Sequence, residues 1–175
     1  GIGIVKKQDI LEKQVNLVYL SIGTNLGNRN YNIQKIKFFL NYNNINIINS
    51  SMIYETISWP NKKFPKYYNL VVKIKTELNP IELLNKILLI EKKMGRKRLK
   101  KNEPRVCDID ILDYMGKIIK KKELTLPHPE IHKRSFVLLP FYEIDKNWKH
   151  PLKKLRINEL LKNLGINSYK SVKKI

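Results

Sequence analysis

Cysteine is almost absent from this sequence, with one residue among 175. A single thiol cannot form an intramolecular disulfide or a cysteine-based zinc site, so both are excluded and a reducing compartment is favoured. No apolar run reaches the roughly 18 residues that a membrane span needs, and the first residues lack the apolar core of a signal peptide. We therefore expect a soluble, cytoplasmic protein without a membrane partner.

Negative charge is also scarce: 15 Asp and Glu stand against 35 Lys and Arg, a net charge of +20. Such a balance is typical of proteins that bind polyanions, above all nucleic acid. Lys, Asn and Ile recur along the whole chain, however, which indicates a general bias in residue usage rather than a local patch. Arginine is more informative because its planar guanidinium binds phosphate with two hydrogen bonds. Arg96, Arg98 and Arg105 gather beside one segment.

That segment, residues 104–112 (PRVCDIDIL), alternates carboxylates with apolar residues. In a strand, Asp108 and Asp110 would point to the same face, with Ile109 and Ile111 on the other. Neighbouring carboxylates repel each other unless a cation lies between them. A hard divalent metal that carries phosphate suits this pair, and the preceding arginine-rich loop suits the phosphate oxygens.

The glycine-containing turn at 23–28 follows a predicted strand and precedes a predicted helix, but neither GxGxxG nor GK[ST] is present. This argues against a Rossmann or Walker site. Further strands are predicted over 45–54 and 68–76. Another helix is predicted from the N-cap Asn79 to Met94, and residues 131–144 are predicted to form a helix broken at Pro140.

Two polar residues on these elements leave alternatives open. Asn69 either pairs with the edge of a flat heterocycle or satisfies a neighbouring backbone group. Glu91 falls within the apolar arc of its helix. It either pairs with Arg96 or Arg98, or accepts hydrogen bonds from a bound ligand, and the pattern favours neither.

Five segments together form a more specific pattern. They are 23–27 (GTNLG), 67–69 (YYN), 90–96 (IEKKMGR), 104–112 (PRVCDIDIL) and 126–136 (LPHPEIHKRSF). In order and approximate spacing they resemble the 6-hydroxymethyl-7,8-dihydropterin pyrophosphokinase family of folate biosynthesis, over roughly residues 17–151. The resemblance implies an α/β (α+β), ferredoxin-like fold with a mostly antiparallel central sheet flanked by helices. We expect one domain over 16–165, an extension of unknown role at 1–15, and a basic tail at 166–175.

The resemblance also implies the reaction, the Mg²⁺-dependent transfer of pyrophosphate from ATP to the pterin hydroxymethyl group with release of AMP. Asp108 and Asp110 would hold two magnesium ions and form the catalytic set with Arg96 and Arg105. The ATP contacts would be Glu91, Arg96, Arg98, Arg105, Thr125, His128 and Arg134.

The pterin, on the same resemblance, would lie between the rings of Tyr67 and Phe136. Asn69 and the backbone around Thr56 and Ile57 would contact its polar edge. The expected partners are therefore ATP and the pterin, with no nucleic acid. The protein is expected to be a monomer, and it could be excised from, or fused to, another folate-pathway enzyme.

One departure from the family pattern stands just upstream of the acidic strand. Asn102 and Glu103 replace a Trp-Gly pair that bacterial members commonly carry, and the loop is about one residue shorter. We expect a working but slow enzyme, with an inactive relative as one alternative. The other alternative is a basic RNA-binding module on a ferredoxin-like sheet, but no predicted strand has the aromatic pattern of such modules.

Overall fold

A computed structural model of the chain describes residues 14–97 and 100–175. Within these residues, six strands form the main sheet, in the order β5-β1-β4-β3-β8, with β2 also paired to β4. The pairings are antiparallel. The strands are β1 (Asn16–Thr24), β2 (Asn46–Ser50), β3 (Tyr54–Thr56), β4 (Tyr67–Thr76), β5 (Asp108–Tyr114) and β8 (Val172–Lys174).

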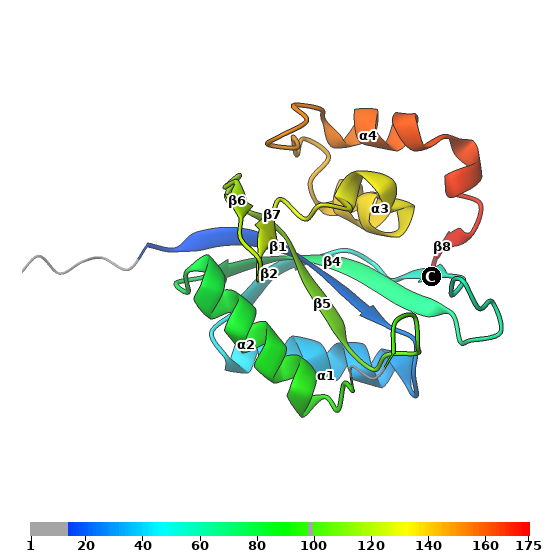
Figure 1. Cartoon of the computed structure of the whole chain (residues 1–175), viewed down its shortest axis with the longest axis horizontal. Helices are drawn as coiled ribbons and strands as arrows, with labels where there is room; N and C mark the ends of the chain where they lie inside the picture. The colour runs from blue at the N-terminus through cyan, green and yellow to red at the C-terminus, as the bar shows by residue number, and fades with distance from the viewer. Residues whose placement is uncertain (1–13, 98–99) are drawn as a thin grey trace, which may run out of the picture.

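The helices cover both faces of this sheet (Figure 1). Helices α1 (Arg29–Tyr42) and α2 (Pro80–Lys93) lie on one face, and α3 (Ser135–Ile144) and α4 (Ile157–Leu164) lie on the other. With β2 and β3 counted together as one strand, the chain follows β-α-β-β-α-β and the strand order 4-1-3-2. This arrangement is the ferredoxin-like fold, so the predicted fold class is confirmed.

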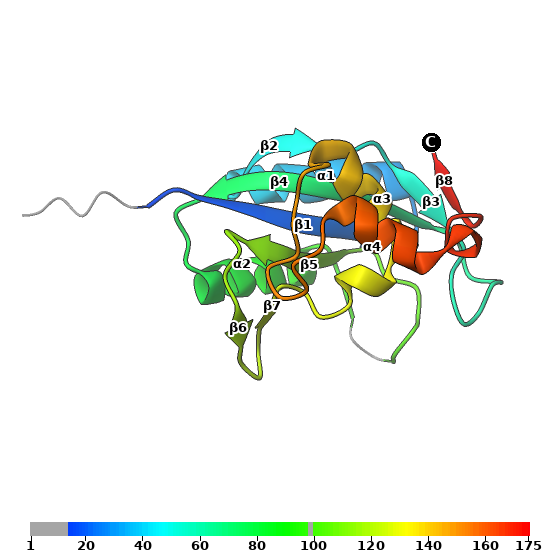
Figure 2. The same ribbon diagram turned by 90° about the horizontal axis from the view of Figure 1, so that it is seen from above.

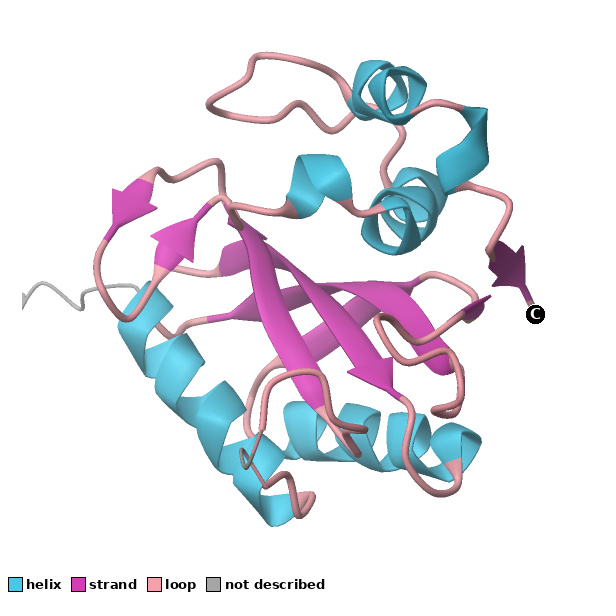
Figure 3. Cartoon of the chain, turned by 45° about the vertical axis from the view of Figure 1, so that its right-hand side comes forward, coloured by secondary structure: helices cyan, strands magenta, loops and turns pink. Residues whose placement is uncertain are grey.

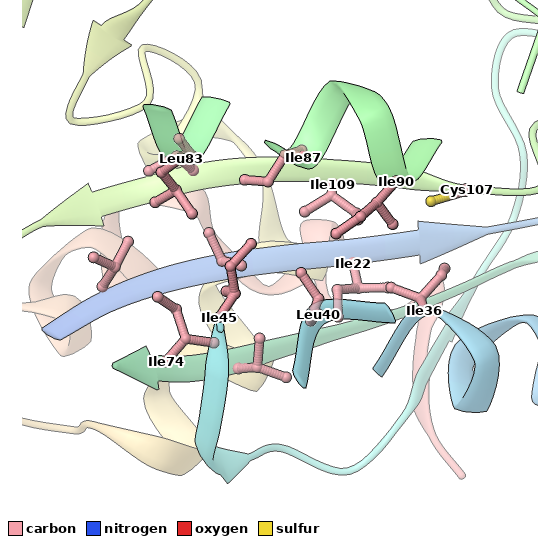
Figure 4. Packing of buried hydrophobic residues seen from close by; sticks show 14 of the residues in the cluster. Ile22, Ile36, Leu40, Ile45, Ile74, Leu83, Ile87, Ile90, Cys107 and Ile109 are labelled. Atoms are coloured by element: carbon pink, nitrogen blue, oxygen red, sulfur yellow. The ribbon is translucent and has the colours of Figure 1, made fainter. Parts of the chain in front are cut away.

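Strand β4 shows why both faces need a cover. Its side chains alternate, so Leu70, Val72 and Ile74 enter the core beneath α1 and α2, while Val71 enters the core beneath α3 and α4. Figure 4 shows the first core, where Ile36 and Leu40 of α1 meet Ile87 and Ile90 of α2 over the sheet. All four side chains are buried.

Helix α2 begins as the sequence predicts. The Asn79 side chain accepts from the backbone N–H of Glu82, and the Glu82 side chain accepts from the N–H of Asn79 at 3.1 Å, which forms a capping box. Gly95 follows the C-cap with φ +86°, a conformation that glycine adopts without strain. The end of α2 is therefore fixed, and with it the start of the arginine-rich loop.

Two predicted elements are wrong in detail. The strand predicted over 45–54 is divided into β2 and β3, because the N–H of Val71 in β4 donates to Ser51 Oγ at 3.0 Å and the Ser51 hydroxyl interrupts the ladder. The helix predicted over 131–144 begins at Ser135 and continues through Pro140. Pro140 lies in the second turn, where its missing N–H costs the helix a single hydrogen bond.

The end of the chain is folded, where a basic tail is predicted. A 3-10 turn, η2 (Ile166–Ser168), leads to β8, which pairs with β3. A separate pair of short strands, β6 (Ile119–Lys120) and β7 (Thr125–Leu126), extends away from the main sheet (Figure 2). Among the described residues no helix is both long and apolar enough to cross a membrane.

Candidate functional site

Three paired positions on neighbouring strands form a row across the middle of the sheet. Gly23 in β1 is paired with Asp108 in β5 on one side and with Asn69 in β4 on the other. Residues that are paired across strands share a face, and so do residues two apart in one strand. Asp110 and Tyr67 therefore join the same face, and the prediction that both acids share a side of the sheet is confirmed.

Gly23 has a specific reason to lack a side chain. A Cβ atom at this position would lie 3.1 Å from Asn69 Oδ1 and 3.9 Å from the Cβ of Asp108. The glycine thus lets the carboxamide and the carboxylate approach over the middle strand.

One cavity gathers the residues predicted to contact the pterin. It has a volume of 360 Å³, and its walls include Thr56, Ile57, Tyr67, Asn69 and Phe136. The Asn69 amide Nδ2 donates to Thr56 Oγ1 at 3.0 Å, so its partner is a side chain and not the backbone. We name this space the aromatic cavity. It offers two rings and a fixed polar pair, which suits a flat molecule with a hydrogen-bonding edge.

Carboxylates and guanidinium groups alternate beside this cavity. Arg96 Nη1 donates to Asp108 Oδ1 at 3.0 Å, and Arg105 Nη1 donates to Asp108 Oδ2 at 3.3 Å. Arg96 is also bonded to Glu91, whose Oε2 accepts from the N–H of Ile109 at 3.1 Å. The end of α2 is thereby tied to the start of β5, and Asp108 lies between two cations.

Asp110 has a different environment. Its Oδ2 lies 3.8 Å from Arg134 Nη1 and 3.8 Å from His128 Nε2. Burial and the neighbouring Asp108 raise the pKa of Asp110 to about 6, although Arg134 lowers it. Burial and Arg134 lower the pKa of His128 to about 4, so this imidazole is neutral at pH 7. An incompletely neutralised carboxylate beside a second one fits the binding of a further cation.

A second cavity, of 260 Å³, is lined by both acids. Its polar walls are Glu91, Arg96, Arg105, Asp108, Asp110, His128 and Arg134. We name it the arginine cavity. Arg105, Asp108 and Arg134 line both cavities, so Asp108 stands where the two spaces meet, while Asp110 lines the arginine cavity alone of the two. Such a site can hold an aromatic molecule and a polyanion side by side.

The family model of 7,8-dihydro-6-hydroxymethylpterin-pyrophosphokinase (HPPK) matches residues 19–146. The chain belongs to the HPPK family. A curated relative, the 2-amino-4-hydroxy-6-hydroxymethyldihydropteridine pyrophosphokinase of Aquifex aeolicus, is 40% identical over 146 residues, which cover 81% of this chain and 88% of that protein.

The chain also matches part of longer proteins. The folic acid synthesis protein fol1 of Pneumocystis carinii is 36% identical over 96% of this chain, but the chain spans 22% of its length. The solved structure of Plasmodium falciparum HPPK-DHPS with pteroate has a TM-score of 0.74 and 19% identity, over 93% of this chain and 46% of that one. At that identity the likeness concerns the fold.

One of the predicted HPPK contacts within the described residues is not brought into either cavity. Thr125 lies exposed on β7 and is not part of either wall. Arg98 falls outside the described residues. The structure brings the predicted pterin contacts to the aromatic cavity and the remaining predicted ATP contacts to the arginine cavity. Their contacts with ligands stay predictions.

Sequence reasoning missed several residues of the aromatic cavity of this HPPK domain. Trp59, Asn102, Ser171 and Val172 also line it. An exposed tryptophan beside a proline in a loop was a signal that could have identified Trp59. Asn102 belongs to the Asn102-Glu103 pair, which departs from the family pattern. Ser171 and Val172 offer no local signal, because only the pairing of β8 with β3 brings them to the site.

Proposed function

We propose that this HPPK domain transfers pyrophosphate from ATP to the hydroxymethyl group of 6-hydroxymethyl-7,8-dihydropterin and releases AMP. The observation that carries this proposal is the position of Asp108, which lines both the aromatic and the arginine cavity and accepts from Arg96 and Arg105. A reaction between a flat heterocycle and a polyphosphate requires a charged junction of this kind.

The pterin is assigned to the aromatic cavity. Tyr67 and Phe136 supply rings from opposite elements, β4 and α3, so a flat molecule can stack between them. Burial raises the pKa of Tyr67, so its hydroxyl keeps its proton at neutral pH. The carbonyl of Asn69 is then available to the amino edge of the pterin, while its amide remains held by Thr56.

ATP is assigned to the arginine cavity, where Arg96, Arg105 and Arg134 surround the acids. Their guanidinium groups, which pair with carboxylates in this structure, are suited to phosphate oxygens. Neutral His128 can donate or accept a hydrogen bond at the same wall without adding charge. The hydroxymethyl oxygen would form a bond to the β-phosphorus of ATP and lose its proton to water, while the bond from that phosphorus to the oxygen bridging the α and β positions breaks. AMP would leave with that bridging oxygen.

The donor set fits magnesium. Among the described residues no cluster of three or more His, Cys, Asp or Glu could enclose a metal. Two carboxylates on one face suit Mg²⁺, which binds through one or two protein carboxylates and takes its other ligands from water and phosphate. Asp108 and Asp110 would hold two ions. When bound, they neutralise charge on the triphosphate and orient it.

The alternative functions are less well supported. The family match assigns the chain to an enzyme family, so an RNA-binding module is not favoured. The inactive relative rests on Asn102 and Glu103, and Asn102 lies on the wall of the aromatic cavity. Since several relatives are longer proteins named for folic acid synthesis, we propose that this domain supplies the pyrophosphokinase step there.

The purified chain tests the proposal directly. We expect AMP and the pterin pyrophosphate to form at equal rates from ATP, hydroxymethyl-dihydropterin and Mg²⁺, as separated by chromatography. Omission of the pterin, or removal of the metal with EDTA, should stop AMP formation. Tight RNA binding with a steep salt dependence, in a protein that ignores ATP, would support the RNA-binding module instead.

Gly23→Ala tests how the sheet positions Asn69. The added methyl group would lie 3.1 Å from Asn69 Oδ1, so the carboxamide must move and weaken its bond to Thr56. Because one hydrogen bond contributes about 1–1.5 kcal/mol, we expect the pterin to bind roughly 10-fold more weakly. Calorimetry with the pterin and a non-hydrolysable ATP analogue measures this. An equal loss for both ligands would contradict a local effect on Asn69.

A further inference from the structure

The last eleven residues, 165–175, connect the two opposite walls of the aromatic cavity. We name this segment the C-terminal strap. In Figure 3 the chain runs from α4 along one side of the molecule to β8. The family model ends at residue 146, so the strap lies outside the part of the chain that it matches.

The strap is attached to α3 at both ends of that helix. Ser135, the first residue of α3, donates from Oγ to the carbonyl of Ser168 at 2.7 Å. Near the other end of the helix, Lys174 Nζ lies 2.8 Å from Glu143 Oε1. Phe136 follows Ser135 directly, so the first attachment stands beside the ring that forms one wall of the cavity.

The strap is also attached to β3, which belongs to the opposite wall of the aromatic cavity. Val172 is paired with Thr56, and Lys174 is paired with Tyr54. The N–H of Ile175 also donates to the carbonyl of Ile53 at 2.9 Å. Thr56 is in turn paired with Tyr67 in β4, so Val172, Thr56 and Tyr67 form one row across three strands. Side chains in such a row share a face.

The strap also contributes to the cavity itself. Ser171 and Val172 both line it, together with Tyr67 and Phe136. Val172 is half-buried and Ser171 is exposed at the rim. Neither residue lines the arginine cavity. A change in the strap should therefore affect the two substrates unequally.

We propose that the C-terminal strap is a positioning element for the pterin, in which Ser171 and Val172 set the size of the aromatic cavity and Ser135 holds Phe136 opposite Tyr67. The inference rests on the proposed function, because it assigns the aromatic cavity to the pterin. If the strap only covered the edge of β3, it would stabilise the fold, and changes in it would affect the binding of both substrates to the same degree.

The test compares two tryptophans in the strap. Ser171→Trp adds a large ring at the rim of the cavity, whereas Lys173→Trp adds the same ring at an exposed neighbour that does not line it. With Ser171→Trp we expect the dissociation constant and KM of the pterin to rise at least 10-fold. The dissociation constant of a non-hydrolysable ATP analogue with Mg²⁺ should stay within twofold. Lys173→Trp should leave both affinities within twofold.

A second pair of variants tests the attachment to α3. Ser135→Ala removes the hydroxyl that donates to Ser168, and we expect about a fivefold weaker binding of the pterin with the ATP analogue unaffected. Ser135→Thr keeps the hydroxyl and should restore most of that affinity.

The outcomes separate the strap from the proposed function. Wild-type protein that binds no pterin overturns the proposed function, and the strap proposal with it. Wild-type protein that binds the pterin, together with an unaffected Ser171→Trp, overturns the strap proposal alone. Equal losses of both ligands, with a lower unfolding temperature, would show that the strap serves stability only and would also overturn the proposal.

Discussion

Asp108→Asn is expected to lower the rate of AMP formation by about 1,000-fold or more, and Asp110→Asn by a similar factor, since on the proposed function each removes a charge that would bind the metal ions. The amide keeps the size of the carboxylate but cannot neutralise a cation. Asp108 lines both cavities, and it also aligns Arg96 and Arg105 through its two oxygens. Turnover measured at saturating Mg²⁺ should not recover in either variant.

Asp110→Asn should leave the fold intact. Burial and Asp108 raise the pKa of Asp110, which means that the folded protein disfavours the charged form of this side chain. A neutral amide at position 110 relieves that cost, so we expect the unfolding temperature of Asp110→Asn to equal or exceed that of the wild type. A loss of activity with retained stability assigns the effect to the site.

Asp113→Asn is the matched control. Asp113 belongs to the same strand, is 5% exposed, and lines neither cavity. Its Oδ2 accepts from the N–H of Gly116, so its role is in the turn that follows β5. Activity within threefold of wild type is expected. If Asp113→Asn were as inactive as Asp108→Asn, or if Asp108→Asn kept its turnover, the acidic pair would not be the centre of the reaction.

Much of the centre of this site could be predicted from local patterns. The alternation from Asp108 to Ile111 places both acids on one face of any strand, because the side-chain period is two. The Asn79 cap and Gly95 fix both ends of α2 through backbone geometry alone. The end of α2 sets the positions of Glu91 and Arg96 relative to each other. In the structure Arg96 contacts both Glu91 and Asp108.

The outer walls could not be predicted in this way, because they depend on contacts between distant parts of the chain. Val172 reaches the cavity only through a three-residue strand, and its partner Thr56 lies far away in the sequence. The division between β2 and β3 depends on one hydroxyl, Ser51, which satisfies the N–H of Val71. The ring of Trp59 stands in a loop whose path no periodicity specifies.

Glu91 is the residue for which the sequence left two roles open, and the structure shows the ion pair on which the structural role depends. Its side chain is 4% exposed and pairs with Arg96, whose side chain is 9% exposed. It also accepts from the backbone N–H of Ile109, the second residue of β5. Removal of Glu91 leaves the buried guanidinium of Arg96 with Asp108 alone and leaves the N–H of Ile109 without this acceptor, and breaking a buried ion pair costs more than the pair contributes.

Glu91→Ala is therefore expected to lower the free energy of unfolding by about 3–5 kcal/mol. Glu91→Gln should cost less, about 1–3 kcal/mol, because the amide oxygen can still accept from Ile109. Lys92→Ala, at the exposed next position of the same helix, should change the stability by no more than about 0.5 kcal/mol. Urea unfolding followed by circular dichroism measures all three.

The same variants separate the two roles of Glu91. If the carboxylate mainly holds Arg96 and β5, folded Glu91→Gln should bind a non-hydrolysable ATP analogue with an affinity within about threefold of wild type. A threefold change corresponds to less than about 1 kcal/mol of binding free energy. A variant as stable as wild type that binds the analogue more than 10-fold more weakly would make Glu91 a ligand contact instead. Because Arg96 bridges Glu91 and Asp108, a structural Glu91 still acts on the reaction through the position of that guanidinium.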